Sequence, residues 1–354
     1  MRRAMKRLLG LGLLLTVISM ITFAAMNFLG DPLFNILGPV AEDVDNPDSV
    51  KLIEEAKEQY YLDKSLPERY ARWAGDFVTG DFGVRFSATG QPPVTDLIKE
   101  RFPRTLQLMI MAQLIAVGLA IPWAVIAASR ANSKTDKAST VTAFAFVSLP
   151  NFALAIILFY IFSIRLDWTP DVYTASDPFW GLTHDHQLMQ MLLPALTLGM
   201  GAAAGYQRLL RTDLITTLQQ DFILMARSKG VPRRKVLYKH ALRPSLFSLI
   251  TLLAINIGFL IGGALVVETF FRIPGLGTAV VEAVLREDFP VVLAIVMIVA
   301  TAFLVFNYLA DLLYGVIDPR VREKEKYETS SRIYFFSSRK RRVEPATETV
   351  EAPA

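Results

Sequence analysis

Six long apolar segments constrain the fold of this chain more than any other feature of its sequence. They cover roughly residues 8–29, 105–129, 139–163, 190–212, 246–271 and 291–316. An α-helix needs about twenty consecutive apolar residues to cross the hydrocarbon core of a bilayer. The ten-residue segments of alternating polarity that are typical of membrane β-barrels do not occur. The sequence therefore predicts an all-α polytopic membrane protein with six transmembrane helices.

Lysine and arginine are distributed unevenly between these segments, although the net charge is only +4. Basic residues precede the first segment, separate the second from the third and the fourth from the fifth, and follow the sixth. The alternate connections are acidic or poor in base, most clearly at residues 42–48. Lysine and arginine collect on the cytoplasmic side of membrane proteins. We therefore expect both termini in the cytoplasm, and we interpret the basic clusters as topology signals, with no nucleic acid as a partner.

Several kinds of chemistry are absent from the sequence. The chain has no cysteine, which excludes disulfides and thiolate metal ligands. It has no G-x-x-x-x-G-K-[ST] loop to hold phosphates, so we do not expect it to hydrolyse ATP or to carry catalytic residues. His184 and His186, one residue apart, are the nearest approach to a metal-binding pattern. Two such histidines do not make a preformed site, so no metal centre is expected.

The chain can be divided into four parts. These are the cytoplasmic start with an uncleaved first helix (1–29), an extracytoplasmic helical insertion (30–104), a five-helix core (105–320) with a cytoplasmic loop at 213–245, and a tail (321–354). In the insertion, residues 50–61 and 66–77 have the apolar spacing of amphipathic helices, and Gly80 and Gly83 mark a turn. The tail is polar and expected to be disordered; its basic run can adhere to anionic lipid.

The cytoplasmic loop has the pattern of two short helices interrupted at Gly230. Glycine readily adopts the left-handed conformation that ends a helix, and Pro232 is suited to the first turn of the next. The small side chain of Ala226 leaves room for another protein to approach the helix closely. A basic loop with this pattern between two membrane spans predicts a docking element for a cytoplasmic protein.

Polar residues within the spans are candidates for a translocation path. Pro150 removes a backbone hydrogen bond and should bend the third span, leaving Ser148 and Asn151 as a polar kink near the middle of the membrane. Asn256 is a further candidate on the fifth span. A purely structural kink, with Asn151 bonded to a neighbouring helix, remains open.

Four blocks of sequence carry a resemblance to a known family. They are Ala226-x-x-x-Gly230 followed by His240-Ala-Leu242; Leu66-Pro-x-x-Tyr70 with Gly80-Asp-Phe-Gly83; Val266 to Gly277; and Asp288-Phe-Pro, Asn307 to Tyr314 and Asp318-Pro-Arg320. At these residues the chain resembles the permease subunits of type I ABC importers of the dipeptide/oligopeptide/nickel subgroup, specifically a B-type peptide permease subunit. It departs from the usual loop at Leu224 and Met225, and from the usual aromatic residue at Ile273.

The resemblance implies a function, partners and site residues. It implies import of di- or oligopeptides by alternating access across the bacterial inner membrane, with a homologous second permease, one or two ATPase subunits that bind ATP and Mg²⁺, and an extracytoplasmic binding protein as partners. The expected sites are the ATPase-coupling residues Ala226, Arg227, Gly230, Arg233, Lys239 and His240, and the extracytoplasmic gate or binding-protein contacts Tyr70, Trp73, Glu268, Pro274, Gly275 and Gly277. Nickel or another small solute remains an alternative cargo, and a secondary transporter or channel an alternative class.

Overall fold

The computed structural model describes residues 2–29, 33–86, 90–169, 173 and 185–317. The described backbone is helical, and its strand-like pairing is an isolated antiparallel bridge between Val84 and Pro93. Residue contacts divide the chain into a unit Met1–Asn307 and a unit Tyr308–Ala354. The sites below belong to the first unit. The predicted tail 321–354 and His184 lie outside the described residues, as do the side chains of Asp185 and His186.

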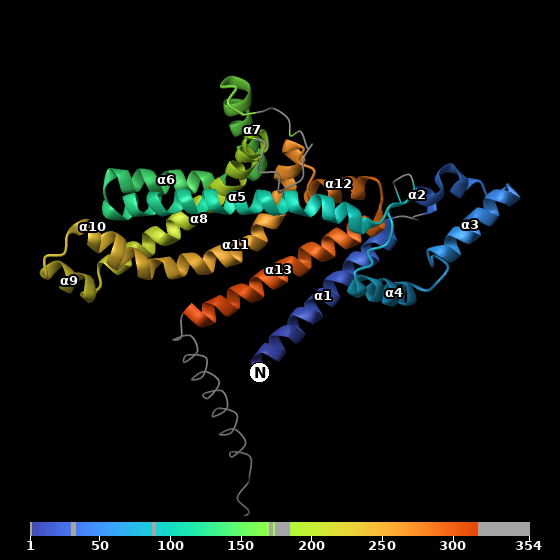
Figure 1. Ribbon diagram of the computed structural model, residues 1–354, viewed down its shortest axis with the longest axis horizontal. Helices are drawn as coiled ribbons and strands as arrows, with labels where there is room; N and C mark the ends of the chain where they lie inside the picture. Colours follow the sequence, from blue (N-terminus) through green and yellow to red (C-terminus); the bar gives the residue numbers. More distant parts are fainter. Residues whose placement is uncertain (1, 30–32, 87–89, 170–172, 174–184, 318–354) are drawn as a thin grey trace, which may run out of the picture. The chain divides into compact units, whose positions relative to one another are not determined.

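Figure 1 shows the order of the helices along the chain. In sequence they are α1 (Arg2–Leu29), α2 (Leu33–Leu37), the 3₁₀-helix η1 (Gly38–Glu42), α3 (Pro47–Gln59), α4 (Leu66–Thr79), α5 (Val94–Ser129), α6 (Lys134–Ser148), α7 (Asn151–Phe159), the π-helix η2 (Tyr160–Arg165), α8 (Asp185–Leu218), α9 (Asp221–Ser228), α10 (Arg233–Lys235), the π-helix η3 (Val236–Ala241), α11 (Leu242–Phe271), α12 (Leu276–Leu285) and α13 (Phe289–Ile317).

All six predicted spans fall on helices. By length and composition, three described helices can cross a membrane: Leu9–Phe28, Val94–Ser129 and Phe289–Leu309. Two bent pairs raise the number to five if each forms one span, namely Lys134–Ser148 with Asn151–Arg165 and Arg233–Leu253 with Ile255–Phe271. The fourth predicted segment lies within the single long helix α8. The protein is thus an all-α polytopic membrane protein.

Helix α5 begins earlier than the sequence suggested. The predicted apolar segment starts at residue 105, but the helix begins at Val94 and contains Pro103 as well as Pro122. Pro103 has no N–H to donate a hydrogen bond to the carbonyl of Lys99. Because Lys99 is exposed, water can bond to this carbonyl instead. The apolar segment therefore marks the membrane-spanning part of a helix that continues about three turns further out.

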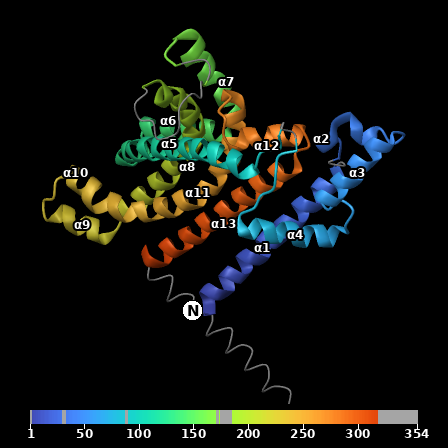
Figure 2. The ribbon, with the colours of Figure 1, turned by 45° about the vertical axis from the view of Figure 1, so that its right-hand side comes forward.

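Small residues bring α5 and α8 close together at the centre of the bundle. A Cβ atom added to Gly199 would lie 2.7 Å from the carbonyl oxygen of Ala112, so these backbones are nearly in contact. Close approach through glycine and alanine is the usual way in which membrane helices associate. Helix α8 also packs against α6 and α11, as Figures 1 and 2 show from two directions.

Polar contacts reinforce the packing of α6 against α8. Arg211 on α8 makes a bidentate ion pair with the buried Asp136 in the first turn of α6, with Nη2 2.7 Å from Oδ2. One helical turn earlier, Gln207 Nε2 donates to the Ser139 hydroxyl over 2.9 Å. Paired in this way, the buried charge and the buried amide fix the register of the two helices.

Candidate functional site

The loop between α8 and α11, which the sequence predicts to be cytoplasmic, contains a complete glycine-ended helix. Helix α9 stops at Ser228, and Gly230 has φ +76°, as the sequence predicted. The Gly230 N–H donates to the Arg227 carbonyl over 2.9 Å, and the Val231 N–H donates to the Ala226 carbonyl over 3.2 Å. This pair of bonds defines a Schellman motif, which satisfies the last carbonyls of the helix. The glycine therefore sets the angle between α9 and the segment that follows.

The loop is anchored in the bundle core by apolar side chains. Ile223 of α9, and Val236 and Ala241 of η3, are buried in one cluster with residues of α5, α8 and α11. Arg233 Nη2 donates to the carbonyl of Ser129, the last residue of α5, over 2.7 Å. Because its side chain is held against α5, Arg233, predicted as a docking residue, also ties the loop to the membrane helices.

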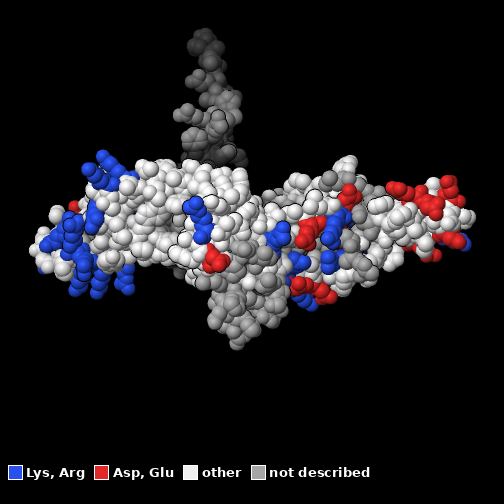
Figure 3. Space-filling model, turned by 90° about the horizontal axis from the view of Figure 1, so that it is seen from above, with Lys and Arg blue, Asp and Glu red and all other residues white. Residues whose placement is uncertain are grey.

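The outer surface of the loop is both apolar and basic. Phe222, Leu224 and Met225 of α9 and Tyr238 of η3 are exposed, Leu224 at 64% and Met225 at 59%. Among the predicted coupling residues, Arg227, Gly230 and Lys239 are exposed, while Ala226 and His240 are half-buried. Figure 3 shows Lys and Arg gathered at the end of the molecule that carries α9 and α10. Exposed apolar groups with a rim of charge are typical of a protein-binding surface.

These exposed apolar residues were not predicted from the sequence. Leu224 and Met225 were noted only as departures from the family pattern, and no role was predicted for Phe222 or Tyr238. A signal was present, since Phe222, Ile223, Leu224 and Met225 are consecutive in a helix of eight residues. Four successive positions cover the full circumference of an α-helix, so they cannot all face the core.

The predicted kink at Pro150 is a sharp break. Helices α6 and α7 meet at 106° across Leu149 and Pro150. Ser148 and Pro150 are exposed, while Asn151 is half-buried. A Cβ atom added to Gly263 of α11 would lie 2.9 Å from Asn151 Nδ2, and one added to Gly201 of α8 would lie 3.9 Å from its Oδ1. The Asn151 amide therefore lies where α7, α8 and α11 meet.

Asn256 belongs to a second polar group on the same face of α11. It lies seven residues before Gly263, which is two turns or ~10 Å along the helix. Its Nδ2 donates to the hydroxyl of Tyr206 over 2.8 Å, and Gln113 of α5 is also within hydrogen-bond distance of that hydroxyl. Tyr206 is fully buried. The structure thus puts Asn151 and Asn256 at two levels of one interface and leaves Ser148 outside it.

Four of the predicted gate or contact residues lie close together where α11 connects to α12: Glu268, Pro274, Gly275 and Gly277. Glu268 is fully buried, and its Oε2 accepts hydrogen bonds from the N–H groups of Gly277 (2.7 Å) and Thr278 (3.3 Å) in the first turn of α12. Pro274 and Gly275 form the connection between the two helices. A carboxylate at a helix N-terminus satisfies free donors and the positive end of the helix dipole. Oε2 is satisfied in this way, whereas the buried Oε1 has no hydrogen-bond partner among the described residues.

Tyr70 and Trp73 face the first membrane helix. Their rings lie 5.6 and 5.7 Å from that of Phe23 on α1, and the hydroxyl of Tyr70 is 2.8 Å from that of Ser19. Both are half-buried on α4. The amphipathic helix predicted at residues 66–77 thus contacts α1 through its aromatic face.

These features define a class: a helical membrane protein in which a basic loop with exposed apolar side chains is packed into the core of the helix bundle. Residues 120–323 match the family described as the binding-protein-dependent transport system inner membrane component. The chain is 36% identical to the oligopeptide transport system permease protein AppB of Bacillus subtilis (strain 168) over 309 residues, which is 87% of this chain and 94% of that protein. It is 35% identical to the glutathione transport system permease protein GsiC of Escherichia coli (strain K12) over 320 residues, 90% of this chain and 98% of that protein. The chain belongs to this family of importer permeases.

Proposed function

We propose that this chain is the B-type permease subunit through which an ATP-driven importer takes up short peptides. Two relatives named for oligopeptide and glutathione transport support a peptide cargo, since glutathione is itself a short peptide. Each match covers nearly the whole relative. The proposal includes a homologous second permease, one or two cytoplasmic ATPase subunits that bind ATP and Mg²⁺, and an extracytoplasmic binding protein.

The observation that carries the proposal is the construction of the cytoplasmic loop. Three of its exposed apolar residues, Phe222, Leu224 and Met225, are on the same short helix as the buried Ile223. A partner that moves α9 would therefore move the cluster shared by α5, α8 and α11, because a packed interior transmits displacement. A secondary transporter or a channel has no need of such an element.

In this mechanism the chain does no chemistry of its own. The ATPase subunits close on ATP and displace α9, and the bundle responds by opening the path to the extracytoplasmic side. The interface that contains Asn151 and Asn256 is the surface we assign to the path, because its amides can exchange hydrogen bonds with a passing peptide backbone. Glu268 and the α11–α12 connection are held by hydrogen bonds near its extracytoplasmic end.

The experiment is transport by the assembled complex in proteoliposomes, with the binding protein outside, Mg-ATP inside and a labelled peptide. Gly230→Val should uncouple ATP hydrolysis from uptake, because a β-branched residue at φ +76° is strained by about 1–2 kcal/mol and the loop changes direction. Ala226→Trp should act similarly by blocking close approach. Gly230→Asn is the matched control, since asparagine tolerates this conformation. Normal coupled uptake in both Gly230→Val and Ala226→Trp would refute the docking role.

A further inference from the structure

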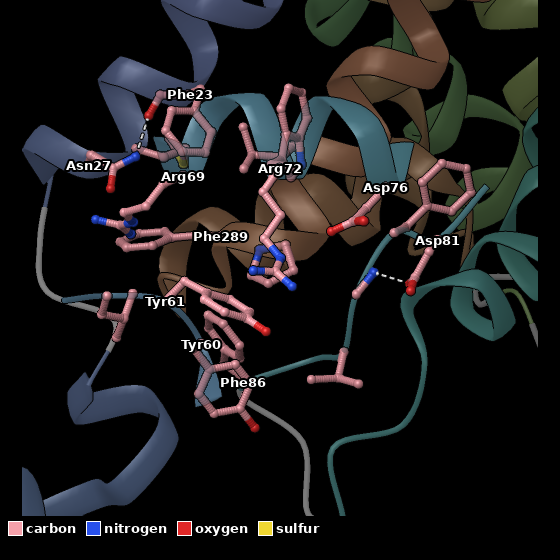
Figure 4. Close-up of a pocket in the computed structure, with 18 of the residues that line it drawn as sticks. Phe23, Asn27, Tyr60, Tyr61, Arg69, Arg72, Asp76, Asp81, Phe86 and Phe289 are labelled. Carbon is pink, nitrogen blue, oxygen red and sulfur yellow. Dashed lines mark hydrogen bonds between the residues drawn. The ribbon is translucent and has the colours of Figure 1, made fainter. Parts of the chain in front are cut away.

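A cavity of about 350 Å³ lies where α1, α4 and the start of α13 meet (Figure 4). Its walls include Phe23, Tyr60, Trp73, Phe86, Phe289 and Leu293, which are mainly aromatic. Its polar groups are of both signs: Arg69 and Arg72 from α4, with Asp76 and Asp81. The coupling loop and the polar interface of α7, α8 and α11 contribute no residue to its lining.

The charged groups are separated within the cavity. Arg69 and Arg72 are three residues apart and therefore share one face of α4. In Figure 4, Arg69 lies at one side, the carboxylates of Asp76 and Asp81 lie at the other, and Arg72 is between them. The Arg72 guanidinium carbon is 3.5 Å from the centre of the Tyr61 ring, which holds the charge over an aromatic face. Such a site has no net charge but has a positive and a negative end.

The depth of the cavity indicates what can reach it. Phe23, which lines it, is five residues inside the span Leu9–Phe28, about 8 Å from its end at 1.5 Å per residue. Leu293 is four residues inside the span that begins at Phe289. The bond between Tyr70 and Ser19 places α4 still deeper along α1. The apolar lining from these two span ends and the charged lining from α4 therefore match the boundary between the hydrocarbon core and the head-group region, where a phospholipid presents its head group and its first methylenes.

We propose that this cavity binds the head group of a phospholipid carrying a primary ammonium, of the phosphatidylethanolamine type. Arginine guanidinium groups at Arg69 and Arg72 match the geometry of the phosphate oxygens. Asp76 and Asp81 accept hydrogen bonds from the ammonium. The apolar floor at Phe23, Met26 and Leu293 receives the first methylenes of an acyl chain. A lipid held there bridges α1, α4 and α13.

Native mass spectrometry of the purified, delipidated permease complex tests this proposal. The probes are phosphatidylethanolamine, phosphatidylcholine and phosphatidylglycerol with identical acyl chains. The wild-type complex should retain phosphatidylethanolamine best, because phosphatidylcholine has no N–H to donate and phosphatidylglycerol has no cation. Arg72→Gln should weaken this binding about tenfold, the loss expected for one charge-assisted hydrogen bond. Asp76→Asn should reduce the preference for phosphatidylethanolamine over phosphatidylcholine.

Arg165 provides a matched control, because its guanidinium also lies over a tyrosine ring, that of Tyr160 at 5.9 Å, but outside the cavity. Arg165→Gln should leave lipid retention unchanged. Both Arg72 and Asp76 are exposed, so their variants should fold, and an unchanged melting temperature confirms this. Equal retention of the three lipids, or unaltered binding in both cavity variants, overturns the proposal. So does a loss of binding-protein affinity in Arg72→Gln without any change in lipid retention.

Discussion

At the scale of single residues, Gly275 and Gly277 are explained by the carboxylate beside them. A Cβ atom added to Gly275 would lie 2.4 Å from Cδ of Glu268, and one added to Gly277 would lie 2.5 Å from Cα of Leu265. Neither contact can be relieved by a flexible side-chain end, because the carboxylate is held by α12 and the other neighbour is backbone. The two glycines of the Pro-Gly-Leu-Gly sequence are therefore required because a side chain at either position would collide with the buried Glu268 or with the backbone of α11.

We predict that Gly275→Ala lowers the melting temperature of the purified complex. The added methyl group must displace Glu268 from its bonds to α12, and overpacking of this kind costs about 1–3 kcal/mol. Gly262→Ala is the control, since a Cβ atom added there meets nothing within 4 Å. Scanning fluorimetry of the two variants gives the comparison. Equal melting temperatures of the two variants would show that the site around Glu268 can accommodate a methyl group, against the close contacts described above.

The sequence could indicate that Gly230 ends a helix and that Pro150 bends a span, because both effects are local to the backbone. It could not indicate the hydrogen bonds of Glu268 or the burial of Tyr206. Glu268 is nine residues from Gly277, and Tyr206 is 50 residues from Asn256 and 93 from Gln113. Such pairings depend on how helices pack, which no periodicity encodes. The roles predicted for Ser148, Pro150 and the coupling residues remain predictions.

At the scale of elements, α9 has one face buried in the bundle core and one exposed apolar face. Ile223 is fully buried in the cluster with α5, α8 and α11, whereas its neighbour Phe222 is 47% exposed. The same eight residues thus contribute to the core on one side and carry the proposed docking surface on the other. The amphipathic helices α3 and α4 were predicted to within three residues from apolar spacing, but the two-sided α9 was not, because its apolar residues are continuous.

We predict opposite defects for two alanine substitutions in α9. Ile223→Ala should destabilise the chain by about 2–5 kcal/mol, because it leaves a cavity in the cluster. Phe222→Ala should leave stability unchanged and weaken ATPase association, because only an exposed ring is lost. Melting temperature and co-purification of the ATPase subunits measure the two effects. Loss of stability in Phe222→Ala with intact association would mean that this ring is a structural residue.

At the scale of the whole chain, the positions of the basic residues predict an orientation in the membrane. The basic loop between α8 and α11 and the insertion between α1 and α5 are separated by apolar helices. Figure 3 shows a mostly uncharged band between the basic end and the charged residues of the insertion. Such a band is what a bilayer requires, and the positive-inside rule assigns the basic end to the cytoplasm.

The orientation can be tested by labelling single cysteines in intact cells. The chain has no cysteine of its own, so each introduced thiol reports one position. Ser65 precedes α4 and Ser228 ends α9, and both are exposed, so a thiol at either position can be reached by a reagent. Ser49 in the same insertion is a poor labelling position, because it is 5% exposed and donates a hydrogen bond to Asp43. With both termini in the cytoplasm, Ser65→Cys should react with a membrane-impermeant maleimide, while Ser228→Cys should react only after the membrane is opened. The reverse pattern would place the coupling loop outside the cell, and the proposed docking to a cytoplasmic ATPase would then be wrong.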